Sequence, residues 1–225
     1  MDSTVSNSAL WLPEVQGVLD RLHTLADAHD DAIIQQVRGD GSTWKSASSE
    51  QKATLLRDAL LPIPRSGGHF LYAVARSIAA KRIVEFGTSW GVSTIYFAAA
   101  LRDLGGGLVV SSELEASKVA KAKQHLEEAG LSKFVEIRAG DALQTLRDPG
   151  GTIDLLFLDG WKDLYLDVLS LASPCLRRGS VVLADDVCLF PEELAPYLEY
   201  VRNPAHGFVS VTLPLGDGIE YSVRL

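Results

Sequence analysis

The feature that most constrains the fold is an alternation between short apolar runs and longer amphipathic segments in the middle of the chain. Five runs have the length of strands, and several are continuously apolar: 82–86, 107–112, 133–138, 153–158 and 179–184. Strands buried on both faces of a parallel sheet have this composition. The segments between them have helical periodicity: 91–103, 115–129, 141–147 and 162–175. Such alternation predicts right-handed crossovers and a doubly wound α/β sheet.

The two ends of the chain have other patterns. PEELAPYLEYVRN predicts a helix that starts at Pro191, and the segments FVSVTL and IEYSVRL, joined by PLGDG, predict a hairpin. This hairpin would complete the sheet with an antiparallel C-terminal strand. Residues 1–80 predict an N-terminal helical cap with helices near 14–38, 48–60 and 67–80. We expect one domain over residues 1–225, with the α/β core in 81–225.

Composition narrows the classes of partner. The net charge of −8 and the pI near 5.1 disfavour a nucleic-acid-binding surface, which needs clustered Lys and Arg. No apolar run approaches the roughly 18 residues that span a bilayer, and the N-terminus lacks a signal-peptide pattern. We therefore expect a cytoplasmic protein with a small-molecule partner and no membrane partner. Cys175 and Cys188 are predicted to be buried free thiols in a reducing compartment.

Ligands of open α/β sheets bind at the carboxyl ends of the strands, so the residues that follow each strand are the candidates. The first strand leads into EFGTSWG, which contains Glu85, Gly87 and Ser89. Gly87 would allow a sharp turn and a close approach to a ligand. The glycines are four residues apart, which does not match a dinucleotide fingerprint and disfavours a nicotinamide dehydrogenase. A plain tight turn explains this stretch equally well.

Two further acids follow the next two strands. Glu113 would be brought to the hydroxyls of a bound ribose, although an exposed acid near a helix N-terminus is the alternative. Asp141 could accept a hydrogen bond from an exocyclic amino group, or it could only cap the helix that begins there. Glu85, Glu113 and Asp141 thus recur where one nucleoside would need acceptors.

Three aspartates follow the fourth and fifth strands. Asp159, Asp185 and Asp186 would repel one another unless a cation or protons intervene. Oxygen ligands of this kind suit Mg²⁺ or another hard divalent cation better than zinc. The alternative is that these acids face solvent or cap the next segment.

The runs FLDGWKDLYL and VVLADDV resemble the metal-dependent catechol O-methyltransferases of the class I S-adenosylmethionine-dependent fold, closely over residues 81–187. The resemblance implies a seven-stranded, Rossmann-like methyltransferase sheet and S-adenosylmethionine as cofactor. It implies that Trp161 stacks on the adenine and that Glu113 binds the ribose. The full implied cofactor-binding set is Glu85, Gly87, Ser89, Ser93, Glu113, Asp141, Ala142, Asp159 and Trp161.

The resemblance also implies the catalytic and metal residues. Asp159, Asp185 and Asp186 would hold the divalent cation, although the family usually has asparagine at the last position. Lys162 would take the proton of a catechol-like acceptor, with its pKa lowered by the cation, and Glu220 would hold the second hydroxyl. A cation-bound phenol loses its proton more readily than a free one.

Several alternatives stay open from the sequence. Lys162 could be a surface lysine on a helix, and the apolar segment ALLPIP could be core rather than a lip over an aromatic substrate. A metal-independent methyltransferase acting on nitrogen or another acceptor fits many of the same residues. So does a non-catalytic S-adenosylmethionine-binding protein. The helical N-terminal extension could supply a homodimer contact.

Overall fold

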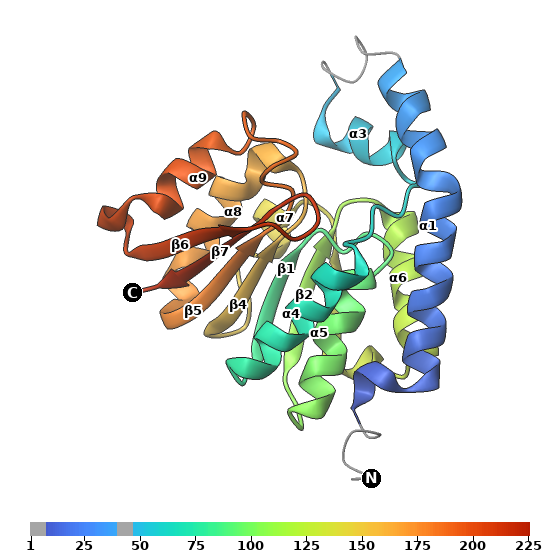
Figure 1. The fold of residues 1–225 in the computed structure, drawn as a ribbon, viewed down its shortest axis with the longest axis horizontal. Helices are drawn as coiled ribbons and strands as arrows, with labels where there is room; N and C mark the ends of the chain where they lie inside the picture. Colours follow the sequence, from blue (N-terminus) through green and yellow to red (C-terminus); the bar gives the residue numbers. More distant parts are fainter. Residues whose placement is uncertain (1–7, 40–46) are drawn as a thin grey trace.

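The computed structural model describes residues 8–39 and 47–225. Those parts of the predicted cap that fall on residues 1–7 and 40–46 lie outside the described residues. A twisted sheet forms the centre of the molecule, and helices cover both of its faces (Figure 1). No helix in the described part of the chain combines the length and apolarity needed to cross a membrane.

Seven strands of the described residues form the sheet, in the order β3-β2-β1-β4-β5-β7-β6. The strand β7 runs antiparallel to both β5 and β6, and the other neighbouring pairs are parallel. This confirms the doubly wound sheet with an antiparallel C-terminal strand. The strands are β1 (Arg82–Phe86), β2 (Leu108–Glu113), β3 (Val135–Ala139), β4 (Ile153–Leu158), β5 (Leu176–Ala184), β6 (Phe208–Leu213) and β7 (Ile219–Arg224).

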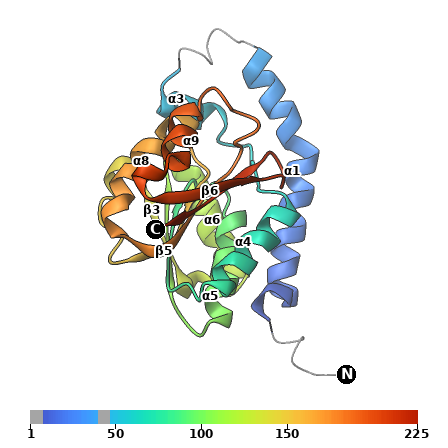
Figure 2. The same ribbon diagram turned by 60° about the vertical axis from the view of Figure 1, so that its left-hand side comes forward.

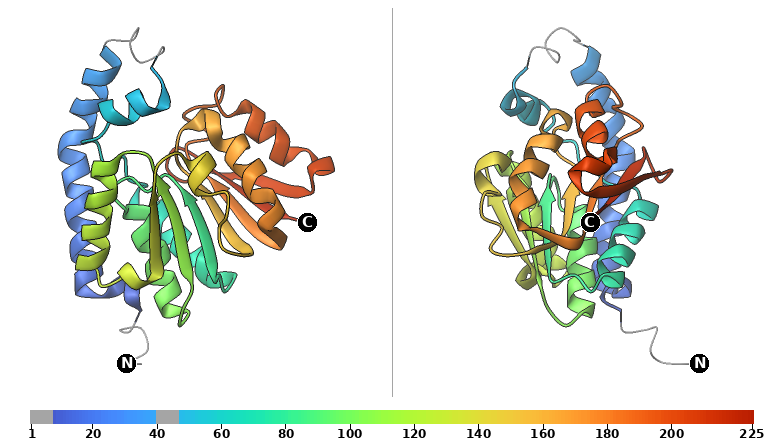
Figure 3. Two further views of the ribbon diagram at one scale, coloured as in Figure 1. Left: turned by 180° about the vertical axis from the view of Figure 1, so that it is seen from behind. Right: turned by 90° about the vertical axis from the view of Figure 1, so that its left-hand side faces the viewer.

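The helices form two layers. In the views of Figures 1 and 3, α4 and α5 cover one face of the sheet and α7, α8 and α9 the other, while α1 lies along α6. Figure 2 shows α3 at the same end of the molecule as the C-terminal end of α1. The helices are α1 (Pro13–Gly39), α3 (Ser49–Leu55), α4 (Arg65–Ser77), α5 (Val92–Asp103), α6 (Ala116–Glu128), α7 (Ala142–Thr145), α8 (Tyr165–Ala172) and α9 (Ala195–Arg202).

Burial explains why the central strands are continuously apolar. Consecutive residues of a strand point to opposite faces, so Ile83 and Val84 enter two different clusters of buried side chains. Val109 and Val110 divide in the same way, and all four side chains are fully buried. Apolar residues are therefore favoured on both faces of each central strand.

Three predicted elements differ from the structure. The last helix begins at Ala195 rather than at Pro191, which places Pro196 in its first turn. Proline lacks an amide donor and is tolerated in the first turn, whereas a start at Pro191 would put Pro196 in the helix interior. The strand β5 begins at Leu176, earlier than the predicted start at residue 179. The helix α4, which was predicted as part of the cap, packs against α5 and belongs to the layer over the sheet.

The cysteines were predicted to be buried, and this prediction is wrong for Cys188, which is exposed. Cys175 is half-buried in the turn before β5, and both thiols are free. Cys188 follows the end of β5, in a loop where its amide donates to the Asp217 carbonyl at 2.8 Å. Apolar neighbours in the sequence therefore did not indicate burial here.

Candidate active site

A cavity of about 680 Å³ lies at the carboxyl ends of β1, β2, β4 and β5. Residues of α1, α3 and the segment 60–63 line its other side, so the cap and the sheet enclose it together. This is where ligands of doubly wound sheets bind. The predicted site residues that line it are Gly87, Ser89, Ser93, Glu113, Asp141, Ala142, Asp159, Trp161, Lys162, Asp185 and Asp186.

Glu85 lies behind the cavity wall rather than on it. Its carboxylate is fully buried and accepts hydrogen bonds from the hydroxyls of Ser93 (2.7 Å), Thr94 and Ser111. Burial raises the pKa of Glu85, although these three hydrogen bonds oppose the rise. Glu85 therefore holds the start of α5 against β1 and β2, and its partner Ser93 is the group exposed to the cavity.

Gly87 makes the close approach that the sequence predicts. Its φ of 102° lies in the left-handed region, and a Cβ atom there would be 2.4 Å from the backbone oxygen of Asp159. The Asp159 amide in turn donates to the Phe86 carbonyl at 2.8 Å. Only glycine fits at this position, because backbone rather than a movable side chain opposes the Cβ.

Glu113 is held with its carboxylate at the cavity wall. One oxygen accepts from the Ser89 amide at 2.8 Å, and the other accepts from the Glu115 amide at 2.9 Å. The Ser89 hydroxyl donates to the Leu60 carbonyl at 2.6 Å, which ties the loop after β1 to the cap segment. Ser89 has a φ of 47°, a strained value for a residue with a side chain. The loop is thus braced on two sides.

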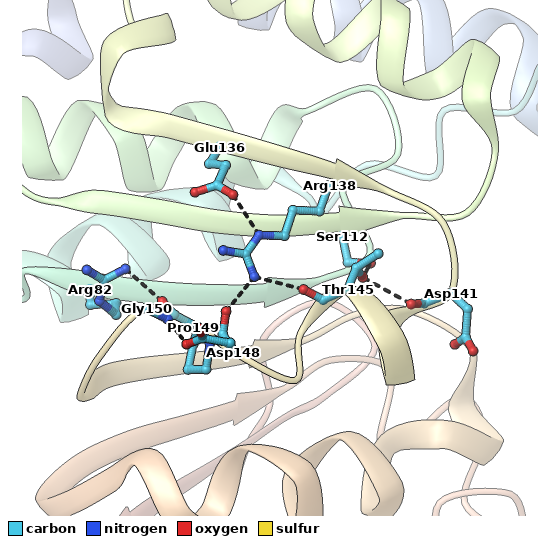
Figure 4. A network of polar contacts seen from close by, with 9 residues as sticks. All are labelled: Arg82, Ser112, Glu136, Arg138, Asp141, Thr145, Asp148, Pro149 and Gly150. Atoms are coloured by element: carbon cyan, nitrogen blue, oxygen red, sulfur yellow. Dashed lines mark hydrogen bonds and ion pairs between the residues drawn. The ribbon is translucent and has the colours of Figure 1, made fainter.

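Asp141 both caps a helix and lines the cavity. Its carboxylate accepts from the Leu143 amide at 2.9 Å, so the predicted capping role is present, and its backbone oxygen accepts from the Thr145 hydroxyl at 3.1 Å. Figure 4 shows the surrounding network, in which Arg138 donates to the Thr145 carbonyl and Ser112 contacts the Thr145 hydroxyl. The network fixes the turn that carries Asp141.

Trp161 lines the cavity on the loop that follows β4. Gly160 precedes it, and a Cβ atom at Gly160 would lie 2.4–2.6 Å from three carbons of the Phe86 ring. The absence of a side chain at Gly160 therefore lets this loop pack directly on Phe86. The tight packing also sets the position of Asp159 on the other side of Gly160.

The acidic end of the cavity is organised around Lys162. Its ammonium donates to Asp186 at 2.7 Å, lies 3.4 Å from Asp159 and donates to the Tyr165 hydroxyl at 2.8 Å. The Tyr165 hydroxyl donates onward to the Asp185 carbonyl at 3.3 Å. The side chain of Lys162 is only 15% exposed. The structure therefore brings the predicted lysine and two of the three aspartates into direct contact.

Burial and mutual repulsion disturb these acids. Burial raises the pKa of Asp159 well above its ordinary value, with Lys162 opposing the rise and the neighbouring aspartates adding to it. Burial, followed by repulsion from Asp186, raises the pKa of Asp185 to about 7. Burial lowers the pKa of Lys162, but attraction to Tyr165, Asp159 and Asp186 outweighs it and holds the value well above ordinary. Without a bound cation Lys162 is therefore positively charged, and the lowered pKa expected with a bound cation stays a prediction.

The donors suit a hard divalent cation in kind, since all three are carboxylates and two are buried with raised pKa. Their arrangement is less complete than predicted. Across residues 8–39 and 47–225, no three His, Cys, Asp or Glu side chains are grouped closely enough to hold a metal ion. Lys162 is instead the positive partner of Asp186 and Asp159.

Glu220 is not brought to this site. It is fully buried in β7, where it forms an ion pair with Arg202 and accepts from the hydroxyls of Ser210 and Thr212. These hydrogen bonds outweigh burial and lower the pKa of Glu220. Its carboxylate is thus occupied within the hairpin, which does not fit the predicted contact with a substrate hydroxyl.

Sequence reasoning missed three residues of the cavity region. Tyr165 is three positions after Lys162, and that helical spacing could have indicated their contact. Asp217 also lines the cavity, but the PLGDG turn that contains it predicts only a hairpin connection. Lys118 lines the cavity beside Ser89, and no sequence signal distinguishes it from Lys121 and Lys123 of α6, which are less buried.

Comparison with known proteins relates this geometry to one group. A family model described as a methyltransferase domain matches residues 84–187. The catechol O-methyltransferase of Mycobacterium tuberculosis is 38% identical over 122 residues, which cover 53% of this chain and 54% of that protein. The catechol O-methyltransferase of Sus scrofa is 30% identical over 138 residues, which cover 58% of this chain and 73% of that protein. The chain spans about half the length of several curated relatives that it matches.

The structure is also similar to solved O-methyltransferases. The O-methyltransferase TomG from Streptomyces achromogenes, solved in complex with S-adenosylmethionine, is 26% identical with a TM-score of 0.67. The match covers 80% of this chain and 90% of that chain. The structural match therefore covers more of the chain than the family model does.

Proposed function

Since the chain belongs to the class I S-adenosylmethionine-dependent O-methyltransferases, we propose that it transfers a methyl group from S-adenosylmethionine to a hydroxyl of a catechol-like aromatic molecule. The observation that supports this most strongly is the position of Lys162 between Asp159 and Asp186, on the loop that also carries Trp161. One cavity thus has a nucleoside-compatible wall and a charged end.

The cofactor lies along the ends of β1, β2 and β3. Glu113, with both oxygens oriented by backbone amides, accepts hydrogen bonds from the ribose hydroxyls. Asp141, Ala142 and Trp161 enclose the adenine, since all three line the cavity. Gly87, which packs against the Asp159 backbone, borders the methionine part.

The acceptor occupies the other end of the cavity. The centroid of the Phe190 ring lies 5.7 Å from the Lys162 ammonium, and Leu61 and Leu189 also line the cavity and are 41% and 49% exposed. Apolar side chains at a pocket mouth suit a flat aromatic ring. A homodimer contact supplied by the N-terminal helices is also part of the proposal.

The protein's main task in the chemistry is alignment. The methyl group of a sulfonium is already activated, so holding the oxygen, the methyl carbon and the sulfur in line can contribute several kcal/mol. The Lys162 amine is the group placed to orient the reacting oxygen, and it would receive the proton of that oxygen once a bound cation has lowered its pKa and left it neutral. Asp159, Asp186 and Tyr165 fix the position of that amine.

A divalent cation is part of the proposal. Asp159, Asp185 and Asp186 would hold it. Such a cation favours the phenolate form of a bound hydroxyl and compensates the carboxylate charge that raises the pKa of Lys162. Asp186 in place of the family's usual asparagine adds one negative charge to the set.

Methyl transfer without a metal is the second candidate, because Lys162 already supplies a positive charge to two of the three aspartates. The purified protein should be incubated with S-adenosylmethionine and catechol or 4-methylcatechol, with Mg²⁺ or with excess EDTA. Mass spectrometry should detect S-adenosylhomocysteine and a monomethylated catechol with Mg²⁺ only. Turnover that persists in EDTA would favour the metal-independent reaction. If no phenol, with or without Mg²⁺, is methylated while the cofactor binds, the chain is a cofactor-binding protein.

A further inference from the structure

Lys118 is a buried lysine that the proposed reaction does not use. It lies in the first turns of α6, is 6% exposed and lines the cavity beside Ser89 and Glu113. Burial lowers the pKa of Lys118, although the charges of Glu113 and Asp30 act in the opposite direction. Buried lysines are rare unless they are paired, so this position calls for a partner.

The partners within the chain are few. The Lys118 ammonium donates one hydrogen bond, to the Ser89 hydroxyl at 3.1 Å. Within the described ranges 8–39 and 47–225, it forms no ion pair. An ammonium has three donors, and a single neutral hydroxyl satisfies one of them. The other two N–H donors of Lys118, which lines the cavity, are left for a ligand group.

Holding the loop after β1 in place does not explain why residue 118 carries a charge. The Ser89 hydroxyl is already anchored to the Leu60 carbonyl. The amides of Leu60 and Leu61 donate to the carboxylate of Asp30 at 2.9 and 2.7 Å, which holds the cap segment to α1. An apolar side chain of the same length at position 118 would fill this space without the cost of burying a charge.

The neighbouring carboxylate indicates which ligand group the ammonium meets. Glu113 only accepts hydrogen bonds, and it faces the cavity with both oxygens oriented by amides. A ribose presents two adjacent hydroxyls, and each can donate and accept. A carboxylate beside an ammonium complements both capacities of such a diol.

We propose that Lys118 is a further cofactor-binding residue, which donates a hydrogen bond to a ribose oxygen of S-adenosylmethionine while Glu113 accepts one from the same diol. The inference rests on the proposed function, because it takes that cofactor as the occupant of the cavity. It goes beyond the resemblance, which places only Glu113 at the ribose.

Calorimetry with three ligands tests this assignment. Binding of S-adenosylhomocysteine and of its 2′-deoxy and 3′-deoxy forms is measured for the natural chain, for Lys118→Met and for Lys123→Met. Lys123 is exposed on the same helix and does not line the cavity, so it controls for the lost charge. Lys118→Met should weaken binding of S-adenosylhomocysteine about tenfold or more, since a charge-assisted hydrogen bond is lost. Lys123→Met should change it less than about twofold.

The deoxy ligands separate direct contact from an effect through Ser89. With at least one of them, the loss caused by Lys118→Met should fall to about twofold or less, because the oxygen that receives the hydrogen bond is missing. An equal loss with all three ligands, or no loss with any, overturns the assignment. If the natural chain itself does not bind S-adenosylhomocysteine, the proposed function fails and this inference fails with it. Circular dichroism of each variant checks that it is folded.

Discussion

Replacing Gly160 with alanine should disturb the site through one measurable clash. The new Cβ would lie 2.4–2.6 Å from three carbons of the Phe86 ring, whereas carbon atoms pack at about 3.5–4.0 Å. The ring would have to move by about 1 Å, and it is 94% buried, since only 6% of Phe86 is exposed. Overpacking of a well-packed interior costs about 1–3 kcal/mol, so Gly160→Ala should lower the free energy of unfolding by that amount.

The clash at residue 160 should also change the position of Lys162 at the charged end of the cavity. Phe86 packs edge-to-face on Tyr165, with ring centroids 6.3 Å apart, and Tyr165 accepts from Lys162 at 2.8 Å. A displaced Phe86 would therefore move the hydroxyl that positions the Lys162 amine. Methyl transfer to a catechol should fall more than tenfold, because small misplacements of reacting groups cost large factors in rate.

Urea denaturation followed by tryptophan fluorescence measures the stability change. Gly17→Ala is the control, since no atom lies within 4 Å of a Cβ there and the residue is exposed on α1. It should be neutral or stabilising by up to about 1 kcal/mol. Adding Phe86→Leu to Gly160→Ala should restore part of the loss, so the two changes should cost less together than the sum of each alone. Unchanged stability of Gly160→Ala, or strict additivity with Phe86→Leu, would refute the packing argument.

Gly87→Ala should abolish measurable binding of S-adenosylhomocysteine in calorimetry, because the Cβ meets the Asp159 backbone at 2.4 Å and φ is 102°; near-normal affinity would contradict this. Hydrogen bonds lower the pKa of Glu220, so its stabilising effect is present above pH ~4.3 and is lost as pH falls through the folded-state pKa. The stability difference between the natural chain and Glu220→Gln should therefore shrink on acidification from pH 6 to pH 3, and a difference that grows would contradict this. Cys188, which is exposed, should react with a thiol reagent faster than half-buried Cys175, as peptide mapping after partial labelling would show, and the reverse order would contradict the structure.

Much of the fold follows from the sequence because burial on both faces requires a distinct composition. Ile83 and Val84 face opposite clusters, and no polar residue can replace either without entering a core. The ends of elements were harder to predict. Arg177 and Arg178 lie in β5 outside its fully buried part, so the apolar pattern does not include them. Pro196, rather than Pro191, determines where α9 can begin.

The site was predictable where local spacing brings residues together. Asp159, Trp161 and Lys162 lie on one loop, so their shared position follows from the end of β4. Positions set by distant partners were not predictable. Glu220 pairs with Arg202, which is 18 residues away in the sequence, and Lys118 donates a hydrogen bond to Ser89, which is 29 residues away. Neither pairing leaves a pattern in the local sequence.

A crystal structure of the chain with S-adenosylhomocysteine, catechol and Mn²⁺, recorded at a wavelength where manganese scatters anomalously, tests the proposed reaction most directly. The proposed reaction predicts an anomalous peak for manganese at bonding distance from oxygens of Asp159, Asp185 and Asp186. A catechol oxygen should lie within hydrogen-bond distance of the Lys162 amine. The absence of such a peak, with Asp186 still paired to Lys162 and catechol bound elsewhere, would contradict it.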